Sequence, residues 1–223
     1  MGEQQNEEQL METARQLSCP SGAYGITTAG NMAVHNSNMI SVTISTLKSE
    51  DKDRILEIGP GGGSHVPEVL HQASALLYYG VDISELMVAE SSKFNKELVT
   101  SGRATFNLSD GETLDFVDDF FNRVFTVNTL YFWKDPDAFA AEILRVLKPG
   151  GTLCVAFAPR SFMEQLPFTK YTFRLYSAEE AKELFQRKGF VLKELDIHQE
   201  VVQVNPELSI NREFIVLTLQ KPV

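Results

Sequence analysis

The stretch Ile55-Leu56-Glu57-Ile58-Gly59-Pro60-Gly61-Gly62-Gly63-Ser64 decides the fold of this chain. Its apolar first half predicts a buried strand, and its glycines predict a tight turn before a helix. Residues without a side chain let backbone amides approach a ligand closely, and the start of a helix adds partial positive charge. Such turns hold nucleotide-like ligands at the carboxyl ends of the strands of a parallel sheet. A tight strand–helix turn that binds no ligand is the alternative.

The turn fails to match two common phosphate-binding patterns. A dinucleotide fingerprint, G-x-G-x-x-G, counted from Gly59 would need a glycine where Ser64 stands. A P-loop would need Gly-Lys-Ser/Thr, and this loop contains no lysine. Glu57, two residues before the first glycine, would repel a pyrophosphate and would suit a ligand that carries an ammonium group. The pattern therefore favours a nucleotide-like ligand other than a dinucleotide.

Length and composition bound the class of protein. A chain of 223 residues predicts a single substantial α/β domain, and a net charge of −10 disfavours nucleic acid as a partner. Cys19 and Cys154 are far apart, which predicts neither a disulfide framework nor a metal site and makes a reducing cytoplasm the expected location. The sequence has no apolar run of membrane-spanning length, and its polar start does not resemble a signal peptide, so we expect no membrane insertion.

The rest of the chain alternates strand and helix signals. Strands are predicted at 55–58, 76–81, 104–108, 124–127, 152–158, about 190–197 and about 214–219. Helices are predicted near 64–75, after Asp135-Pro136, and after Ser177, which forms a capping box with Glu180. This alternation predicts a doubly wound sheet with helices on both faces.

Two segments lie outside this regular pattern. Residues 1–50 are predicted as an N-terminal helical extension or lid, with a helix around 10–17, a loop over 19–25, and helical spacing from 32 to 47. Residues 51–223 form the predicted main domain. Within it, the aromatic stretch at about 159–176 is predicted as an inserted lid over the carboxyl edge of the sheet, with a packed surface loop as the alternative.

Three more polar signals follow predicted strands, at the sheet edge where ligands bind. Asp82 is placed to accept both hydroxyls of a ribose, although an aspartate at the start of a helix is the alternative. Asp110-Gly111 suits an adenine ring, with a side-chain acceptor for the amine and an open backbone amide, although Asp-Gly is also a common turn. Asn128, which begins the run 128–133, has a carbonyl placed to meet an ammonium.

These ordered motifs resemble those of class I S-adenosylmethionine-dependent methyltransferases over roughly residues 50 to 220. The matching runs are Leu56-Glu57-Ile58-Gly59-Pro60-Gly61-Gly62-Gly63, Gly80-Val81-Asp82-Ile83-Ser84, Asp110-Gly111-Glu112-Thr113-Leu114-Asp115-Phe116 and Leu144-Arg145-Val146-Leu147-Lys148-Pro149-Gly150-Gly151. The chain is most similar to the small-molecule branch that includes ubiquinone and menaquinone methyltransferases. The resemblance implies a Rossmann-like seven-stranded sheet of order 3-2-1-4-5-7-6, with strand 7 antiparallel.

The resemblance also implies a role for each cofactor-binding residue. Gly59, Pro60 and Gly61 would run under the methionine and ribose of S-adenosylmethionine, and Glu57 would orient its amino group. Asp82 would hold the ribose hydroxyls. The remaining implied contacts are Ile83 and Gly111 with adenine, Asp110 with the adenine amine, and the Asn128 carbonyl with the methionyl ammonium. Asn122 and Asp115 depart from the usual motif at positions that do not touch the cofactor.

The acceptor is less well defined by the sequence. No Asn/Asp-Pro-Pro-aromatic motif follows the fourth strand, which together with the acidic charge favours a small-molecule methyl acceptor over a nucleic acid base. Candidates for the acceptor pocket are Tyr24, His35, Tyr131 and Trp133, and His65 is a second imidazole that is expected to face the site. Two alternatives stay open: a protein that binds the cofactor without catalysis, and a nicotinamide-dependent oxidoreductase.

Overall fold

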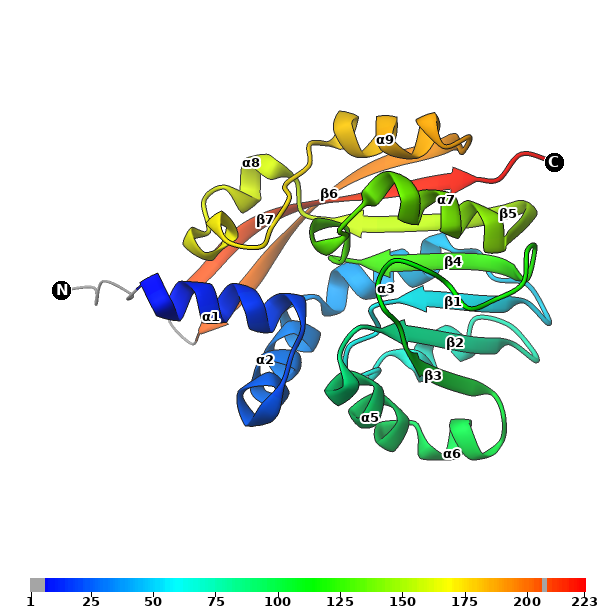
Figure 1. Cartoon of the computed structure of the whole chain (residues 1–223), viewed down its shortest axis with the longest axis horizontal. Helices are drawn as coiled ribbons and strands as arrows, with labels where there is room; N and C mark the ends of the chain where they lie inside the picture. Colours follow the sequence, from blue (N-terminus) through cyan, green and yellow to red (C-terminus); the bar gives the residue numbers. More distant parts are fainter. Residues whose placement is uncertain (1–6, 206–207) are drawn as a thin grey trace.

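The computed structural model describes residues 7–205 and 208–223 (Figure 1). They contain one seven-stranded sheet of order β3-β2-β1-β4-β5-β7-β6. The strands are β1 (Arg54–Ile58), β2 (Leu77–Asp82), β3 (Ala104–Leu108), β4 (Phe121–Val127), β5 (Leu147–Phe157), β6 (Val191–Asn205) and β7 (Leu208–Gln220). Strands β1 to β5 pair in parallel, whereas β7 is antiparallel to both β5 and β6. The predicted fold class, strand order and antiparallel seventh strand are confirmed.

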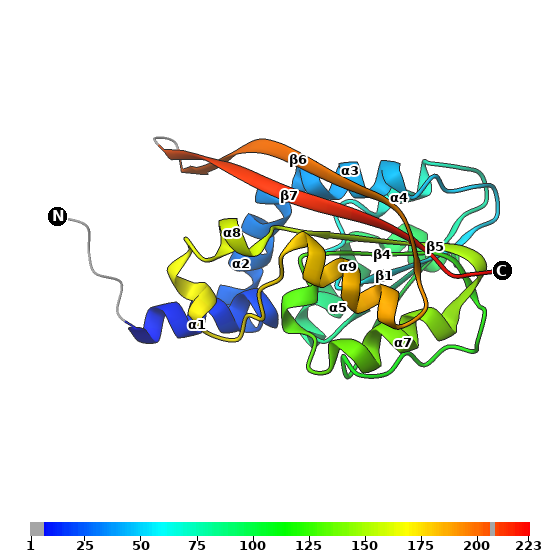
Figure 2. The same cartoon turned by 90° about the horizontal axis from the view of Figure 1, so that it is seen from above.

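Helices cover both faces of the sheet (Figure 2). The α-helices are α1 (Glu7–Ser18), α2 (Gly22–His35), α3 (Ser37–Thr46), α4 (Val66–Leu70), α5 (Glu85–Phe94), α6 (Lys96–Thr100), α7 (Pro136–Val146), α8 (Arg160–Met163) and α9 (Ala178–Arg187), and the 3-10 turns are η1 (Leu130–Phe132) and η2 (Pro167–Lys170). Along β1, Ile55 packs with α3 and α4 on one face, and Leu56 packs with α7 and α9 on the other. This alternation follows from the two-residue period of a strand.

Side-chain caps fix the starts of three helices. The Ser84 hydroxyl accepts from the Met87 amide at 3.2 Å, and the Asp135 carboxylate accepts from the Ala138 amide at 3.0 Å. Ser177 and Glu180 form both hydrogen bonds of a capping box, as predicted. Each cap satisfies an amide that has no partner within the helix. Helix α4 is shorter than the predicted helix at 64–75, because only Val66–Leu70 are helical.

The N-terminal region departs from the predicted loop at 19–25. That prediction is wrong from Gly22 onward, where α2 begins. Gly25 does not break the helix. It is needed for close packing, because a Cβ atom there would lie 2.9 Å from the Pro20 carbonyl carbon and 3.0 Å from the Leu86 side chain. Helices α2 and α3 meet at Asn36, so the helical spacing predicted at 32–47 belongs to two helices. Helix α3 buries Ile44 against the sheet.

The C-terminal strands form a longer hairpin than predicted. The predicted spans of 190–197 and 214–219 fall within β6 and β7, which continue to Asn205 and from Leu208. Figure 2 shows this hairpin running past the end of β5 toward the side of the molecule that carries α1 and α2. The stretch 159–176 contains α8 and η2, and the Tyr171 hydroxyl there donates to Glu7 of α1 at 3.0 Å. The hairpin and this stretch therefore flank the N-terminal helices.

Candidate active site

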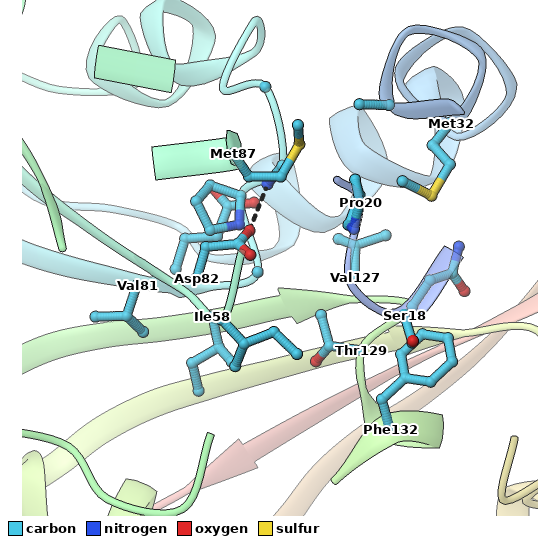
Figure 3. A pocket seen from close by; sticks show the side chains of 18 of the residues that line it. Ser18, Pro20, Met32, Ile58, Val81, Asp82, Met87, Val127, Thr129 and Phe132 are labelled. Carbon is cyan, nitrogen blue, oxygen red and sulfur yellow. Dashed lines mark hydrogen bonds between the residues drawn. The ribbon is translucent and has the colours of Figure 1, made fainter. Parts of the chain in front are cut away.

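A cavity opens at the carboxyl ends of β1, β2 and β4 (Figure 3). All nine residues predicted to bind the cofactor line it: Glu57, Gly59, Pro60, Gly61, Asp82, Ile83, Asp110, Gly111 and Asn128. Figure 3 shows Ile58, Val81 and Asp82 on one side of the cavity, with Met32, Ser18 and Phe132 across from them. The N-terminal helices therefore face the sheet edge across this space.

The glycine turn at the end of β1 depends on close backbone packing. Gly59 has φ +74°, and a Cβ atom there would lie 2.4 Å from the Thr129 methyl carbon. The Gly59 amide donates to the Val81 carbonyl at 2.8 Å, which continues the pairing of β1 with β2. Only a residue without a side chain fits this turn, because both the backbone conformation and the neighbouring threonine exclude one.

Asp82 is the last residue of β2, and its side chain holds the glycine turn in place through a hydrogen bond. Its two carboxylate oxygens accept from the Gly61 amide at 3.1 Å and from the Ser84 amide at 2.9 Å. Burial raises the pKa of this carboxyl to about 6, against the lowering effect of those two amide hydrogen bonds. The residue is 8% exposed, so its charge is held in a poorly solvated site that faces the cavity.

Glu57 is held in a buried polar network. Its carboxylate, on a residue that is 1% exposed, lies 2.8 Å from the His65 Nε2 atom and accepts a short hydrogen bond from the Tyr78 hydroxyl. Burial opposes protonation of His65, but the neighbouring Glu57 charge and hydrogen bond prevail and raise the pKa of the imidazole. This contact joins the glycine turn to β1 and β2. The sequence does not signal it, because the three residues meet only after the strands pair.

Asp110 and Gly111 form a tight turn after β3. The Asp110 carboxylate accepts from the Glu112 and Thr113 amides, each at 2.8 Å, and these hydrogen bonds lower its pKa. Gly111 has φ +72°, and a Cβ atom there would lie 3.0 Å from the Ile83 side chain. The common-turn interpretation therefore describes the local structure, and the same two residues also line the cavity. Their contacts with adenine stay a prediction.

Asn128 follows β4 in a left-handed conformation with φ +58°. Asparagine adopts this region more readily than most residues. Its amide donates to the Ala156 carbonyl at 2.9 Å, and its side-chain oxygen accepts from the Tyr131 hydroxyl at 3.2 Å. The backbone at the end of β4 is thus fixed from two sides, which positions Asn128 at the cavity.

The four predicted acceptor-pocket residues have different placements. Trp133 lines the cavity and donates from its indole nitrogen to the Thr129 hydroxyl at 3.2 Å. Tyr131 is 2% exposed and lies outside the lining, where its hydroxyl bonds both the amide and the carbonyl of Ala158. Tyr24 is half exposed on α2, and His35 ends that helix, and neither lines the cavity. Their roles toward an acceptor stay predictions.

The wall opposite the residues predicted to bind the cofactor comes mainly from the N-terminal helices, where a lid was predicted without the individual lining residues. From the run after β4, pocket-wall aromatics were also expected. The lining residues of this wall are Leu17, Ser18, Pro20, Ala29, Met32, Ala33, Asn36 and Ile40, joined by Phe132 and Phe139 from the region after β4. One signal was present in the sequence: residues 16–47 contain no Asp, Glu, Lys or Arg. A stretch of this kind in an acidic chain indicates that it covers something apolar.

The described residues carry neither a metal-ligand cluster nor a membrane-spanning helix. Among residues 7–205 and 208–223, no group of three or more His, Cys, Asp or Glu side chains is placed to hold a metal ion. In the same residues, no helix is long and apolar enough to cross a membrane.

The cavity fits the cofactor implied by the sequence. Asp82 and Asp110 make its sheet side acidic, whereas Glu57 is paired with His65, and this acidity suits a ligand with a sulfonium and an ammonium group. The Asp82 carboxylate is buried with two amide donors and no cation among its hydrogen-bond partners in the described part of the chain, so it can accept hydroxyl donors from a ligand. The glycine turn leaves room where side chains would otherwise stand.

Comparison with known proteins also indicates a methyltransferase. Residues 56–155 match the family model described as "Methyltransferase domain". An uncharacterized methyltransferase, YdaC, from Bacillus subtilis is 28% identical over 80% of this chain and 92% of its own length. The ubiquinone/menaquinone biosynthesis C-methyltransferase UbiE from Geobacter sulfurreducens is 28% identical over 59% of this chain and 53% of its own length.

The fold is also found in a solved structure. The YcgJ protein from Bacillus subtilis superposes with a TM-score of 0.72 at 17% identity, over 84% of this chain and 99% of its own. At that identity the likeness concerns the fold alone. The sheet order, the methyltransferase domain that matches residues 56–155 and the methyltransferase relatives together support a class I S-adenosylmethionine-dependent methyltransferase.

Proposed function

We propose that this protein transfers a methyl group to a small-molecule acceptor by in-line displacement. The observation that carries the proposal is the division of one cavity into an acidic, glycine-rich side and a facing wall from α1, α2 and α3. When bound, S-adenosylmethionine supplies a methyl group that its own sulfonium charge has already activated. The protein then has to align the two reactants and exclude water.

The cofactor side of the proposal assigns each residue a task. Asp82 accepts the ribose hydroxyls, and Gly59, Pro60 and Gly61 provide the floor beneath the methionine and ribose. Ile83, Asp110 and Gly111 contact the adenine. The Asn128 carbonyl meets the methionyl ammonium, and Glu57 acts on the same group from behind the turn. The lining of one cavity by all nine residues supports this assignment.

The Glu57 assignment takes a more specific form in this chain. Its carboxylate is already bonded to His65 and Tyr78, and it is almost fully buried. We therefore propose that Glu57 acts on the ammonium group indirectly, through the position of His65 and of the glycine turn. His65 is then a positioning residue for the turn, because its Nε2 atom is engaged with Glu57.

The lid role of residues 1–50 is part of the same proposal. Helix α2 presents Ala29, Met32 and Ala33 to the cavity, while Tyr24 and Val34 of the same helix are exposed. Gly25 is the only residue of α2 that is buried, and a helix that buries so little of its surface is suited to move. We propose that α1 and α2 close over the bound reactants and exclude water from them.

Calorimetry with S-adenosylmethionine and S-adenosylhomocysteine tests the cofactor site. Both are expected to bind, and Asp82→Ala is expected to weaken binding by about 2 to 3 kcal/mol, the cost of losing charge-assisted hydrogen bonds. Asp115→Ala is the matched control, because Asp115 is exposed and lies outside the cavity lining. Absence of binding to the wild-type protein would contradict the proposal. Binding without methyl transfer to any of a panel of phenols, amines, thiols and carbon acids would favour a non-catalytic binding protein.

A donor with a chiral methyl group tests the displacement itself. In-line attack inverts the configuration at the methyl carbon, because the new bond forms opposite the breaking C–S bond. Retention would indicate two successive transfers and would contradict a direct displacement.

A further inference from the structure

We propose that the methyl acceptor is an uncharged, largely apolar molecule that binds beneath α2, against Leu17, Met32 and Phe132. This inference rests on the proposed function, because it names the substrate class of the same cavity. The reason lies in how charge is distributed around the lining. The wall that faces the cofactor residues comes mostly from the segment 16–47, which carries no Asp, Glu, Lys or Arg.

Within the described part of the chain, every charged group of the lining lies on the sheet side or in the loops that leave it. Glu57 and His65 are bonded to each other, and Asp82 and Asp110 belong to the predicted cofactor contacts. Lys134 is paired with Glu112 at 2.5 Å. An acceptor whose carboxylate, phosphate or ammonium group lies against the 16–47 wall would therefore bury that charge without a counter-charge from the wall, which is unfavourable.

Three polar side-chain atoms that border the apolar wall are already bonded within the protein, namely the Ser18 hydroxyl, the Asn36 side-chain oxygen and the Thr129 hydroxyl. The Ser18 hydroxyl donates to the Arg15 carbonyl at 2.8 Å, and the Asn36 side-chain oxygen accepts from Arg212 at 2.8 Å. The Thr129 hydroxyl is shared with Thr126 and accepts from the indole of Trp133. A polar group of the acceptor that uses one of these three atoms would have to compete with the hydrogen bond that the atom already makes.

The surface that remains available to the acceptor is apolar and comes from two elements, α2 and η1. Met32 enters from α2 and Phe132 from η1, and Figure 3 shows the two side chains on the same side of the cavity, across from Asp82. A thioether adapts its shape to different apolar ligands, and an aromatic ring offers a flat face. This pair suits a molecule with an apolar body whose nucleophilic atom is turned toward the cofactor side.

A pair of naphthols, of which the second carries an additional carboxylate group, tests the inference. Binding of 2-naphthol, which is neutral at neutral pH, and of 6-hydroxy-2-naphthoate, which is an anion, is measured by calorimetry with S-adenosylhomocysteine bound. The neutral probe is expected to bind roughly tenfold more tightly or better, equivalent to about 1.4 kcal/mol. Equal or tighter binding of the anion, or no binding of 2-naphthol, would overturn the inference.

Two lysine substitutions on α2 test whether 2-naphthol binds beneath this helix. Met32→Lys places a positive charge in the wall. It is expected to lower the ratio of the affinity for 2-naphthol to the affinity for 6-hydroxy-2-naphthoate by roughly tenfold. Asn31→Lys is the matched control, because Asn31 is exposed and absent from the lining, and its preference should stay within about twofold of wild type. An equal effect of both substitutions would contradict a site beneath α2.

Failure of the inference about the acceptor can be told apart from failure of the proposed function. If the wild-type protein does not bind S-adenosylhomocysteine, the proposed function fails before any probe is added. If it binds S-adenosylhomocysteine and prefers the naphthoate, only the apolar class of acceptor is refuted. The S-adenosylhomocysteine affinity of each variant also reports whether its cofactor site is intact.

Discussion

The Arg212 guanidinium of β7 donates to the Asn36 side-chain oxygen at 2.8 Å and so reaches the junction between α2 and α3. A second nitrogen of the same group donates to the His35 carbonyl at 2.7 Å. Arg212 is itself paired with Glu200 of β6 at 2.6 Å, and the two side chains are 9% and 8% exposed. The long hairpin thus holds the junction that contributes Asn36 to the cavity wall.

Removal of this guanidinium should destabilise the protein. Arg212→Ala leaves Glu200 buried without its cation and is expected to lower the free energy of unfolding by about 3 kcal/mol. Denaturant unfolding measures this change. Arg187→Ala is the matched control, because its pair with Asp137 is exposed at both ends and should contribute less than about 1 kcal/mol. Similar losses in the two variants would show that Arg212 has no special role.

Cofactor affinity should depend on the ionisation of Asp82. The carboxylate form accepts the ribose hydroxyls, and burial raises the pKa of this group to about 6 in the free protein. Affinity for S-adenosylhomocysteine is therefore expected to fall as the pH drops through about 6, approaching tenfold per pH unit below it. Calorimetry from about pH 7.5 to about pH 5, on either side of the Asp82 pKa, measures the slope. Asp82→Asn should bind weakly and lose this slope, whereas an unchanged slope would assign the titration to another group.

The raised pKa of Asp82 also makes the stability of the free protein depend on pH, in the opposite direction to the cofactor affinity. The folded pKa of Asp82 lies above its usual value of 3.8, so the folded state binds the proton more tightly than the unfolded chain does. Its contribution to stability is fully present below 3.8 and is lost as the pH rises through about 6. Bound cofactor should remove this loss, because its hydroxyls solvate the carboxylate. Thermal unfolding with and without S-adenosylhomocysteine, at about pH 5 and about pH 7.5, measures the difference.

The pair of His65 and Glu57 gives a second dependence on pH. Because Glu57 raises the pKa of His65, the folded state holds the imidazolium proton more tightly than the unfolded chain does. The stability from this pair should be fully present below 6.5 and should be lost as the pH rises through the folded pKa. His65→Gln is expected to flatten the stability profile above about pH 6.5 relative to wild type. His71→Gln, at an exposed position, is the control.

Much of the fold could be predicted because the decisive signals are local. Strand β3 was predicted at its observed bounds, and the Ser177 capping box was read from four consecutive residues. The residues predicted to bind the cofactor could be grouped from the sequence for a similar reason, because they lie at or shortly after the ends of strands, and parallel strands bring their carboxyl ends together. Asp82 and Asp110 meet at one cavity although 28 positions separate their numbers.

The features that were missed depend on contacts between distant segments. Gly25 indicates a loop by its local propensity, yet it lies inside α2 because the helix packs against Pro20 and Leu86 without room for a side chain. The outer half of the hairpin is rich in polar and charged residues, and its strand structure is supported by the Arg212–Glu200 pair. Propensity gives way to tertiary packing at such positions.

The glycine turn should tolerate substitution at one position and reject it at another. Gly59→Ala forces a side chain into a left-handed backbone and places its Cβ 2.4 Å from the Thr129 methyl carbon, so a loss of about 3 kcal/mol in unfolding free energy is expected. Gly62→Ala is the control, because a Cβ atom at Gly62 would meet no neighbouring atom within 4 Å, and the change in stability should stay below about 1 kcal/mol. Thr129→Ser removes the clashing methyl and keeps the hydroxyl, so the double variant should recover part of the loss. No recovery would mean that backbone strain alone makes Gly59 necessary.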